Sequence, residues 1–289
     1  KYPIGRQKLT NKVVEKATNV YFSKKIDPMA KAENHFPGVT LLITHYNRSS
    51  SLERLLKAFD AISCSFEDIV VSDDASKPEH QEAMAEMRKR FPFRLITTPQ
   101  NKGLANNLNK GQEAVTTPYT LYVQEDFIPK PAFVPKLKAA LGFLNDDASL
   151  DMVRFYAYYE YAHLEPFKEG FSRMIYKPWS AKYDKIYYYS DHPHLRRSTF
   201  LNKFGRYVEG IKSDKAEYMM CLAFIQNKGK GLFYDDFKGL FDQVNSDNEP
   251  STVQRNNWRQ QNNNPFIHLA RTLYRQIKYN YDLRFTRPH

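Results

Sequence analysis

Residues 119–129 read YTLYVQEDFIP, and this stretch indicates both the class of fold and the place of a binding site. Its first half alternates Tyr and Thr with Leu and Val, which is typical of a buried strand. Pro129 ends the strand, because proline has no backbone N–H with which to pair a neighbouring strand. Glu125 and Asp126 therefore lie at the carboxyl end of a strand, which is where ligands bind in open α/β sheets.

Two adjacent carboxylates at the end of an apolar strand cost folding free energy unless a cation binds them there. A divalent cation that bridges a diphosphate would suit their carboxylate oxygens. The other interpretation is that Glu125 and Asp126 only cap the next turn or helix. The residues that precede them in the chain favour the site over the cap.

Apolar runs alternate with helical patterns through the first half of the chain. The patterns predict strands at 39–44, 66–71, 93–97, from Tyr119 onward and at 150–156, with helices at 52–62, 78–90, 104–115 and 131–144. This order implies βαβ crossovers. We therefore expect an α/β fold in which helices flank a mainly parallel sheet.

Polar clusters end three of these strands. Thr44-His45-Tyr46-Asn47-Arg48 ends the first, Ser72-Asp73-Asp74 ends the second, and Gln124-Glu125-Asp126 ends the fourth. Parallel strands place their carboxyl ends at one edge of the sheet. We therefore expect one shared site at this edge, in place of three unrelated caps.

Beyond residue 156 the pattern loosens and becomes rich in tyrosine. A polar segment begins at Asp191, a helix is predicted over 215–226 with Glu217 near its start, and an Asn-rich loop is expected as far as Pro265. The last helical pattern, 266–285, is basic and amphipathic. It is expected to lie on a membrane surface or to dock on the body of the protein.

The positive charge lies at the ends of the chain. Residues 1–36, which include a helical pattern at 6–26, carry eight Lys/Arg against three acids, and residues 250–289 carry seven against one, so together they account for the net charge of +11. Basic ends would attract an anionic partner such as a membrane surface or nucleic acid. The alternative is a pair of solubilising terminal helices.

Composition indicates the compartment. No apolar run approaches the length that spans a bilayer, and the first residues lack the apolar core of a signal peptide. Cys64 and Cys221 have no partner spacing, so neither a disulfide framework nor a zinc site is indicated. We expect a cytoplasmic protein, with a peripheral position at the inner membrane face as the alternative.

Four segments in order resemble the family 2 glycosyltransferases of the nucleotide-diphospho-sugar transferase superfamily. They are Thr44-His45-Tyr46-Asn47-Arg48, Val71-Ser72-Asp73-Asp74-Ala75-Ser76, the stretch from Asn101-Lys102-Gly103-Leu104 through Asn109-Lys110-Gly111, and Val123-Gln124-Glu125-Asp126. The resemblance covers residues 37–129 best and implies a GT-A fold, which is a Rossmann-like nucleotide-sugar-binding fold.

The resemblance implies a role for each matching residue. Donor nucleotide binding is expected from Thr44, Tyr46, Asn47, Arg48, Asp73, Asp74, Lys102, Gly103, Asn109 and Glu125, and a site for Mg²⁺ or Mn²⁺ from Asp126. Glu217 lies nearest the position of the family's catalytic base. Asp191 is the second catalytic candidate, Asp214 and Glu209 are rivals, and His192 with His194 is a candidate metal or phosphate contact.

Two positions depart from the family pattern. Gln124 stands where an aspartate is common, and Leu108 stands where an arginine often helps to hold phosphate. Lys102 or Arg48 are the candidates to replace that arginine. These changes bear on metal binding more than on the fold.

The expected function is transfer of a sugar from a nucleoside diphosphate to a hydroxyl of a saccharide or lipid-linked saccharide, with inversion and a divalent metal, as in polysaccharide biosynthesis. Residues 1–36 would form a basic helical extension, 37–156 the nucleotide-sugar-binding half, 157–249 the acceptor-side half and 250–289 a basic loop and amphipathic helix. The alternatives are an inert glycosyltransferase-like protein and a nucleic-acid-binding module that uses the basic ends. No nucleic-acid-binding motif is found in the body.

Overall fold

The computed structural model describes residues 34–178, 180, 187–245 and 265–287. The helix expected at 6–26, nearly all of the basic extension 1–36 and the loop expected over 250–264 lie outside these residues. Residues 34–36 already belong to the first strand, so the sheet begins before the expected boundary at residue 37. The division into a nucleotide-binding and an acceptor-side half remains an interpretation.

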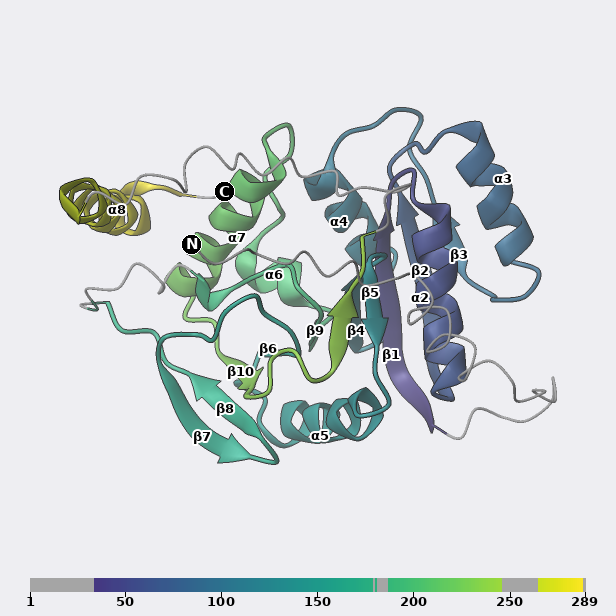
Figure 1. The fold of residues 1–289 in the computed structure, drawn as a ribbon, viewed down its shortest axis with the longest axis horizontal. Helices are drawn as coiled ribbons and strands as arrows, with labels where there is room; N and C mark the ends of the chain where they lie inside the picture. Colours follow the sequence, from purple (N-terminus) through teal and green to yellow (C-terminus); the bar gives the residue numbers. More distant parts are fainter. Residues whose placement is uncertain (1–33, 179, 181–186, 246–264, 288–289) are drawn as a thin grey trace, which may run out of the picture.

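Nine strands of the described chain form one sheet in the order β3-β2-β1-β4-β9-β6-β10-β8-β7 (Figure 1). Their bounds are β1 Asn34–His45, β2 Cys64–Asp73, β3 Arg94–Ile96, β4 Tyr119–Gln124, β6 Met152–Arg154, β7 Leu164–Lys168, β8 Phe171–Met174, β9 His194–Arg197 and β10 Gly231–Tyr234. A separate two-stranded ribbon pairs β5 Phe127–Pro129 with β11 Phe241–Gln243.

The sheet is parallel in its first half and mixed in its second half. Strands β3, β2, β1 and β4 are parallel neighbours, as expected. Strand β9 then inserts antiparallel between β4 and β6, and β8 and β7 add two further antiparallel pairs. The expected α/β class is confirmed, but the sheet taken as a whole is mixed, whereas a mainly parallel sheet was expected.

Helices cover both faces of the sheet. They are α2 Ser49–Ala61, α3 Pro78–Met87, α4 Leu104–Glu113, α5 Phe133–Asp146, α6 Phe200–Phe204 and α7 Ser213–Gln226, while α8 Pro265–Phe285 packs on α7. In β1, Leu41 and Ile43 face the core cluster of α2, α3 and α5, while Leu42 faces the cluster of α4, α6 and α7. All three side chains are fully buried, which explains why this strand is apolar on both faces.

Gly111 allows α4 to lie close to the sheet. A Cβ atom added at this glycine would lie 2.7 Å from Cδ1 of Leu42 and 2.9 Å from Cβ of Ser72. The glycine of the Asn109-Lys110-Gly111 segment therefore serves the packing of α4 against β1 and β2.

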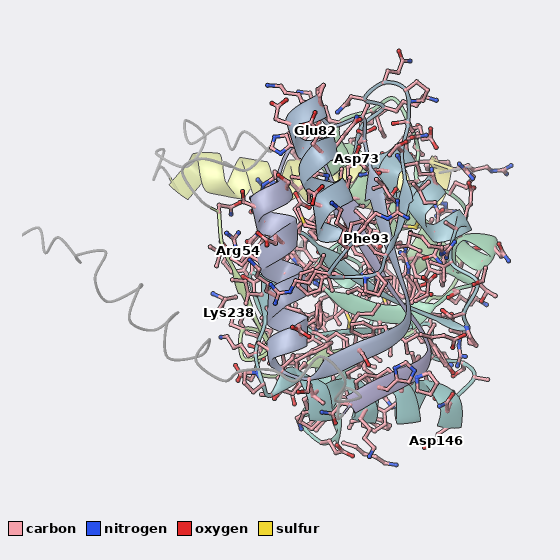
Figure 2. The ribbon with its side chains drawn as sticks, turned by 90° about the vertical axis from the view of Figure 1, so that its right-hand side faces the viewer. Arg54, Asp73, Glu82, Phe93, Asp146 and Lys238 are labelled. Atoms are coloured by element: carbon pink, nitrogen blue, oxygen red, sulfur yellow. The ribbon has the colours of Figure 1, made fainter. Side chains whose placement is uncertain are left out.

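Among the helices that the structure describes, none combines the length with the apolar character that crossing a bilayer requires. Helix α8 lies at the outside of the molecule next to α7 (Figure 1), and the yellow helix projects from the body in Figure 2 as well.

Candidate active site

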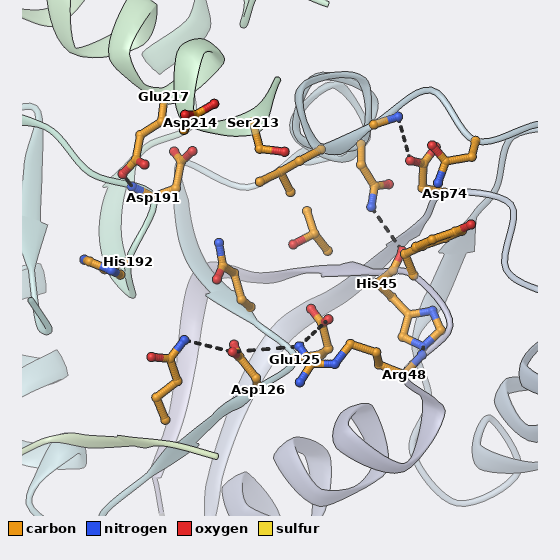
Figure 3. Close-up of a pocket in the computed structure, with 18 of the residues that line it drawn as sticks. His45, Arg48, Asp74, Glu125, Asp126, Asp191, His192, Ser213, Asp214 and Glu217 are labelled. Carbon is orange, nitrogen blue, oxygen red and sulfur yellow. Dashed lines mark hydrogen bonds and ion pairs between the residues drawn. The ribbon is translucent and has the colours of Figure 1, made fainter. Parts of the chain in front are cut away.

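A cleft of about 380 Å³ opens at the carboxyl edge of the parallel strands. Its walls come from the ends of β1, β2 and β4, the start of α4, the segment before β9 and the first turn of α7. Figure 3 shows Asp74 on one wall, Glu125 and Asp126 on a second, and Asp191, Asp214 and Glu217 on a third. Acidic groups from distant parts of the chain therefore meet at one cavity.

Most of the predicted site residues line this cleft. They are Thr44, Tyr46, Arg48, Asp74, Gly103, Glu125, Asp126, Asp191 and Glu217, together with His192 and the rival base Asp214. The structure places Asn47, Asp73, Lys102, Asn109, His194 and Glu209 outside the cavity lining.

Asp74 binds the loop before α4 and borders the cleft. Its Oδ1 accepts the backbone N–H of Lys102 at 2.8 Å, and its Oδ2 accepts that of Gly103 at 2.7 Å. Gly103 takes φ +85, which suits glycine because it lacks a Cβ. Lys102 thus contributes a backbone amide to this turn. The carboxylate fixes the loop before α4 at the rim of the cavity.

Asp73 supports the rim from behind. Its side chain has no exposed surface, and its Oδ1 accepts from Nδ1 of His45 at 2.7 Å while its Oδ2 accepts from the backbone N–H of Ser76 at 3.0 Å. Burial alone would raise the pKa of Asp73, but the hydrogen bonds from His45 and Ser76 outweigh it and lower the pKa. This carboxylate is engaged within the protein and is turned away from the cleft.

Two predicted asparagines hold loops in place. Asn47, at φ 53, accepts the N–H of Lys77 at 2.8 Å through its Oδ1. Asn109 is fully buried and makes hydrogen bonds of 2.9 Å with both the backbone N–H and the carbonyl of Tyr207. Glu209, a rival base, accepts from Nδ2 of Asn109 at 2.8 Å.

Arg48 faces the two acids at the end of β4. Its Nη1 donates to Oε1 of Glu125 at 3.2 Å and lies 3.8 Å from Oδ2 of Asp126. Burial and the neighbouring Asp126 raise the pKa of Glu125, and Arg48 only partly offsets them. The positive charge that the strand-end acids need is therefore supplied in part by the chain itself.

Asp126 offers one carboxylate oxygen to a cation. Its Oδ2 accepts from Nε2 of Gln243 at 2.8 Å, but its buried Oδ1 has no hydrogen-bond partner among the residues that the structure describes. Within the described residues, no group of three or more His, Cys, Asp or Glu side chains forms a closed metal cage. The residues fit an open site, in which one or two carboxylates would hold the ion and a bound phosphate group would complete its coordination.

The third wall holds two linked acids. The backbone N–H of Asp191 donates to Oε1 of Glu217 at 3.0 Å. Oδ1 of Asp191 accepts from the hydroxyls of Tyr189 at 2.9 Å and Tyr207 at 2.7 Å. Burial, and then the charge of Glu217, raise the pKa of Asp191 to about 7, against the two tyrosine hydrogen bonds. Asp191 therefore changes its charge near neutral pH.

A buried arginine backs this wall. The guanidinium of Arg196 has no exposed surface, and its Nη1 lies 3.4 Å from the hydroxyls of both Tyr189 and Tyr207. Sequence analysis did not predict Tyr189, Tyr207 or Arg196 as part of the site. The tyrosine-rich composition after residue 156 was the available signal, but it did not distinguish these tyrosines from ordinary core residues.

The two candidate histidines do not share a site. His192 lines the cleft, and its ring meets that of Tyr158 edge to face at a centroid distance of 4.5 Å. His194 is fully buried, and burial lowers its pKa well below the ordinary value. Leu108 is on the buried face of α4 with 1% exposure, so position 108 does not reach the cleft in this chain, whereas Gln124 does.

Comparisons with known proteins agree with this geometry. The family described as "Glycosyl transferase family 2" matches residues 40–205, which is more than half of the chain. Poly-beta-1,6-N-acetyl-D-glucosamine synthase of Staphylococcus aureus (strain COL) is 26% identical over 91 residues, or 32% of this chain and 22% of that protein. The match with the protein of the same description from Staphylococcus epidermidis has 24% identity over the same length. The chain thus spans about a fifth of these relatives.

Solved structures show the same architecture. The S. aureus TarS 1-349 structure has a TM-score of 0.53 at 14% identity and covers 86% of this chain and 72% of that chain. The same fragment in complex with UDP-GlcNAc has a TM-score of 0.54 at 16% identity, covering 86% and 76%. Similarity at this level shows a shared fold. The expected GT-A fold and enzyme class are confirmed, and this chain belongs to glycosyl transferase family 2.

Proposed function

We propose that this protein transfers a sugar from a nucleoside diphosphate to a hydroxyl group of a saccharide or lipid-linked saccharide, with inversion at the sugar carbon and with the aid of a divalent cation. The observation that carries the proposal is the convergence of Asp74, Asp126 and Glu217 on one cleft. Each comes from a different segment and each suits a different part of such a donor and acceptor pair.

The nucleoside would bind at the rim formed by β1, β2 and the start of α4. Thr44 and Tyr46 line this part of the cleft. The oxygens of Asp74 have lone pairs beyond those used by the two loop amides, and these can accept from a base N–H or a ribose hydroxyl.

The diphosphate would lie over the end of β4. Asp126, with Glu125 beside it, would hold Mg²⁺ or Mn²⁺, and a bound ion would neutralise the charge that gathers on the leaving diphosphate. Arg48 lies next to both acids and keeps a fixed positive charge at this place. It is therefore better placed than Lys102, whose side chain lies outside the cavity lining, to compensate for the missing family arginine.

Glu217 would accept the proton of the attacking hydroxyl. Its Oε1 is bound by the N–H of Asp191, which holds the carboxylate at the wall facing the strand-end acids (Figure 3). Asp214 also lines the cleft but is exposed on the first turn of α7. A positioned carboxylate on the far side of the sugar from the diphosphate is what a single inverting displacement requires.

The choice of donor follows from the neighbours. The TarS structure contains UDP-GlcNAc, and the curated relatives are described as N-acetylglucosamine polymer synthases. We therefore place UDP-GlcNAc first among donors to test. The family match favours this function over a nucleic-acid-binding module.

A second candidate is a donor-binding protein with little turnover. Gln124 lines the cleft where the family commonly has an aspartate, and Arg48 already pairs with the remaining acids. Both observations point to weaker metal binding than in a cleft with a full acidic motif.

Thermal shift with UDP-, GDP- and dTDP-sugars, with and without Mn²⁺, tests donor binding, because a ligand that binds only the folded state raises the melting temperature. A ligand at a hundredfold its Kd contributes about 2.7 kcal/mol. We expect UDP-GlcNAc with Mn²⁺ to give the largest shift and to be hydrolysed slowly without acceptor. Binding without hydrolysis or transfer would support the second candidate, and no shift with any nucleotide sugar would refute both.

A further inference from the structure

Helix α8 packs on α7 through polar groups. The hydroxyl of Tyr218 donates to Oδ2 of Asp282 at 2.8 Å. Nε2 of Gln226 donates to the carbonyl of Leu283 at 3.0 Å and to that of Thr286 at 2.8 Å. The face of α8 that meets the body is thus held by these hydrogen bonds and by the contact of the Tyr279 and Tyr218 rings, whose centroids lie 5.5 Å apart, unlike the apolar face of a surface helix that docks on a core.

The opposite face of α8 is apolar and exposed. Its side chains are Leu273 at 55% exposure, Tyr274 at 66%, Ile277 at 71%, Tyr281 at 60% and Phe285 at 62%. The spacing of four residues from 273 through 277 and 281 to 285 places them on one side of the helix. We call these five residues the outer face of α8. Five of the seven large hydrophobic side chains exposed in the described part of the chain lie here.

The charges exposed along this face are basic. Arg284 is exposed on this face, and Arg287 is exposed just beyond the end of the helix. The ammonium of Lys278 instead pairs with Asp282 and lies 5.0 Å from the ring centroid of Tyr218 in α7. Asp282 is the one acidic residue between 265 and 289, and it is turned to α7 by its bond with Tyr218. An apolar stripe among basic residues is the pattern of helices that lie in the interface of an anionic bilayer.

We propose that the outer face of α8 docks on the surface of an anionic lipid bilayer, with its apolar side chains in the interfacial region and Arg284 and Arg287 at the headgroups. A second copy of the chain suits the face less well. A two-fold contact through it would bring like charges together with no acid on the face to oppose them.

Docking of α8 on a membrane would determine the side from which a lipid-linked acceptor reaches the cleft. This inference about the acceptor rests on the proposed function. Tyr218, which binds α8, follows directly on Glu217 in α7. A membrane docked on the outer face would therefore lie on the α7 side of the molecule, with α8 between the bilayer and α7. A lipid-linked acceptor held in that membrane would be presented from the α7 side of the cleft.

The test is co-sedimentation of the full chain with vesicles of phosphatidylcholine containing phosphatidylglycerol, against vesicles of phosphatidylcholine alone. We expect binding to the anionic vesicles that weakens as salt rises from about 0.1 M to about 1 M. Ile277→Asp with Phe285→Asp should lower the partition coefficient by at least about tenfold. Arg284→Glu with Arg287→Glu should lower it by a similar factor without touching the apolar side chains.

Tyr159→Ser is the matched control, because Tyr159 is 82% exposed but lies far from α8 in the sequence, and it should bind as the wild type does. Circular dichroism and melting temperature show that each variant is folded. Equal partitioning of wild type and both double variants, or no binding to anionic vesicles, would overturn the proposal. So would a concentration-dependent dimer in light scattering that the Ile277/Phe285 variant abolishes while vesicle binding persists. Donor binding is measured separately by thermal shift, so failure of the proposed function is distinguishable from failure of docking.

Discussion

Replacement of Asp191 by asparagine should make the protein more stable at alkaline pH. Asp191 is buried, and its pKa is raised from the ordinary value of 3.8 to about 7. The folded protein therefore holds a proton that the unfolded chain has lost between these two values. The free energy of unfolding falls as pH rises through this window, and the whole loss is present above pH about 7.

The raised pKa sets the size of the effect. Each pKa unit corresponds to about 1.4 kcal/mol, so a shift from 3.8 to about 7 corresponds to about 4 kcal/mol at most. Asparagine has no charge to bury, and its carbonyl oxygen can still accept from Tyr189 and Tyr207. We expect Asp191→Asn to be more stable than the wild type near pH 8, with the advantage disappearing near pH 4.

The assay is thermal or urea unfolding at several pH values. Each kcal/mol of stability changes the melting temperature of a domain of this size by about 2–4 °C. Asp214→Asn changes an exposed carboxylate of the same cleft, and it should stay within about 0.5 kcal/mol of the wild type at every pH. If Asp191→Asn is no more stable than the wild type near pH 8, the buried carboxylate does not lower the free energy of unfolding as pH rises. The reasoning from its burial is then wrong.

Three further predictions concern the cleft and its support. Glu217→Gln keeps an oxygen for the N–H of Asp191 but cannot take a proton, so donor binding should persist while transfer falls by about 10²–10⁴-fold; full activity would remove it as the base. Asp126→Ala should abolish the Mn²⁺-dependent part of donor binding in calorimetry while the circular dichroism spectrum stays unchanged, and equal binding would exclude its metal role. Gly111→Ala places a Cβ 2.7 Å from Cδ1 of Leu42 and should lower the free energy of unfolding by about 1–3 kcal/mol. An unchanged urea midpoint would show that α4 can shift away from the sheet without cost, against the close packing inferred here.

The strand ends were predictable because they follow from local pattern. Apolar runs of strand length mark buried strands, and the polar residues after them must lie where those strands stop. This rule predicted that Asp74 and Asp126 share an edge, and the structure places both at the cleft. It did not predict that β9 inserts antiparallel between β4 and β6, because that pairing joins segments far apart in the chain.

The strand-end rule could not show which of two neighbouring polar residues would face the cleft. Asp73 and Asp74 are adjacent and chemically alike, yet His45 and Ser76 engage Asp73 behind the rim and leave Asp74 at the cleft. The role of Asn109 depends likewise on Tyr207, which lies 98 residues away along the chain. Such contacts exist only once the chain has closed on itself.

The amino-acid sequence by itself determined the class of fold, the edge that carries the site and the family, because hydrophobic period and strand-end chemistry are local properties of the chain. Tertiary structure alone decided which acids face the cavity, that Arg48 meets Glu125, and that Tyr189, Tyr207 and Arg196 surround Asp191. It also decided that α8 turns its apolar face outward. The physical reason is that burial and long-range hydrogen bonds set the charge and direction of a side chain. Neither burial nor such hydrogen bonds can be inferred from the residues adjacent to it in the sequence.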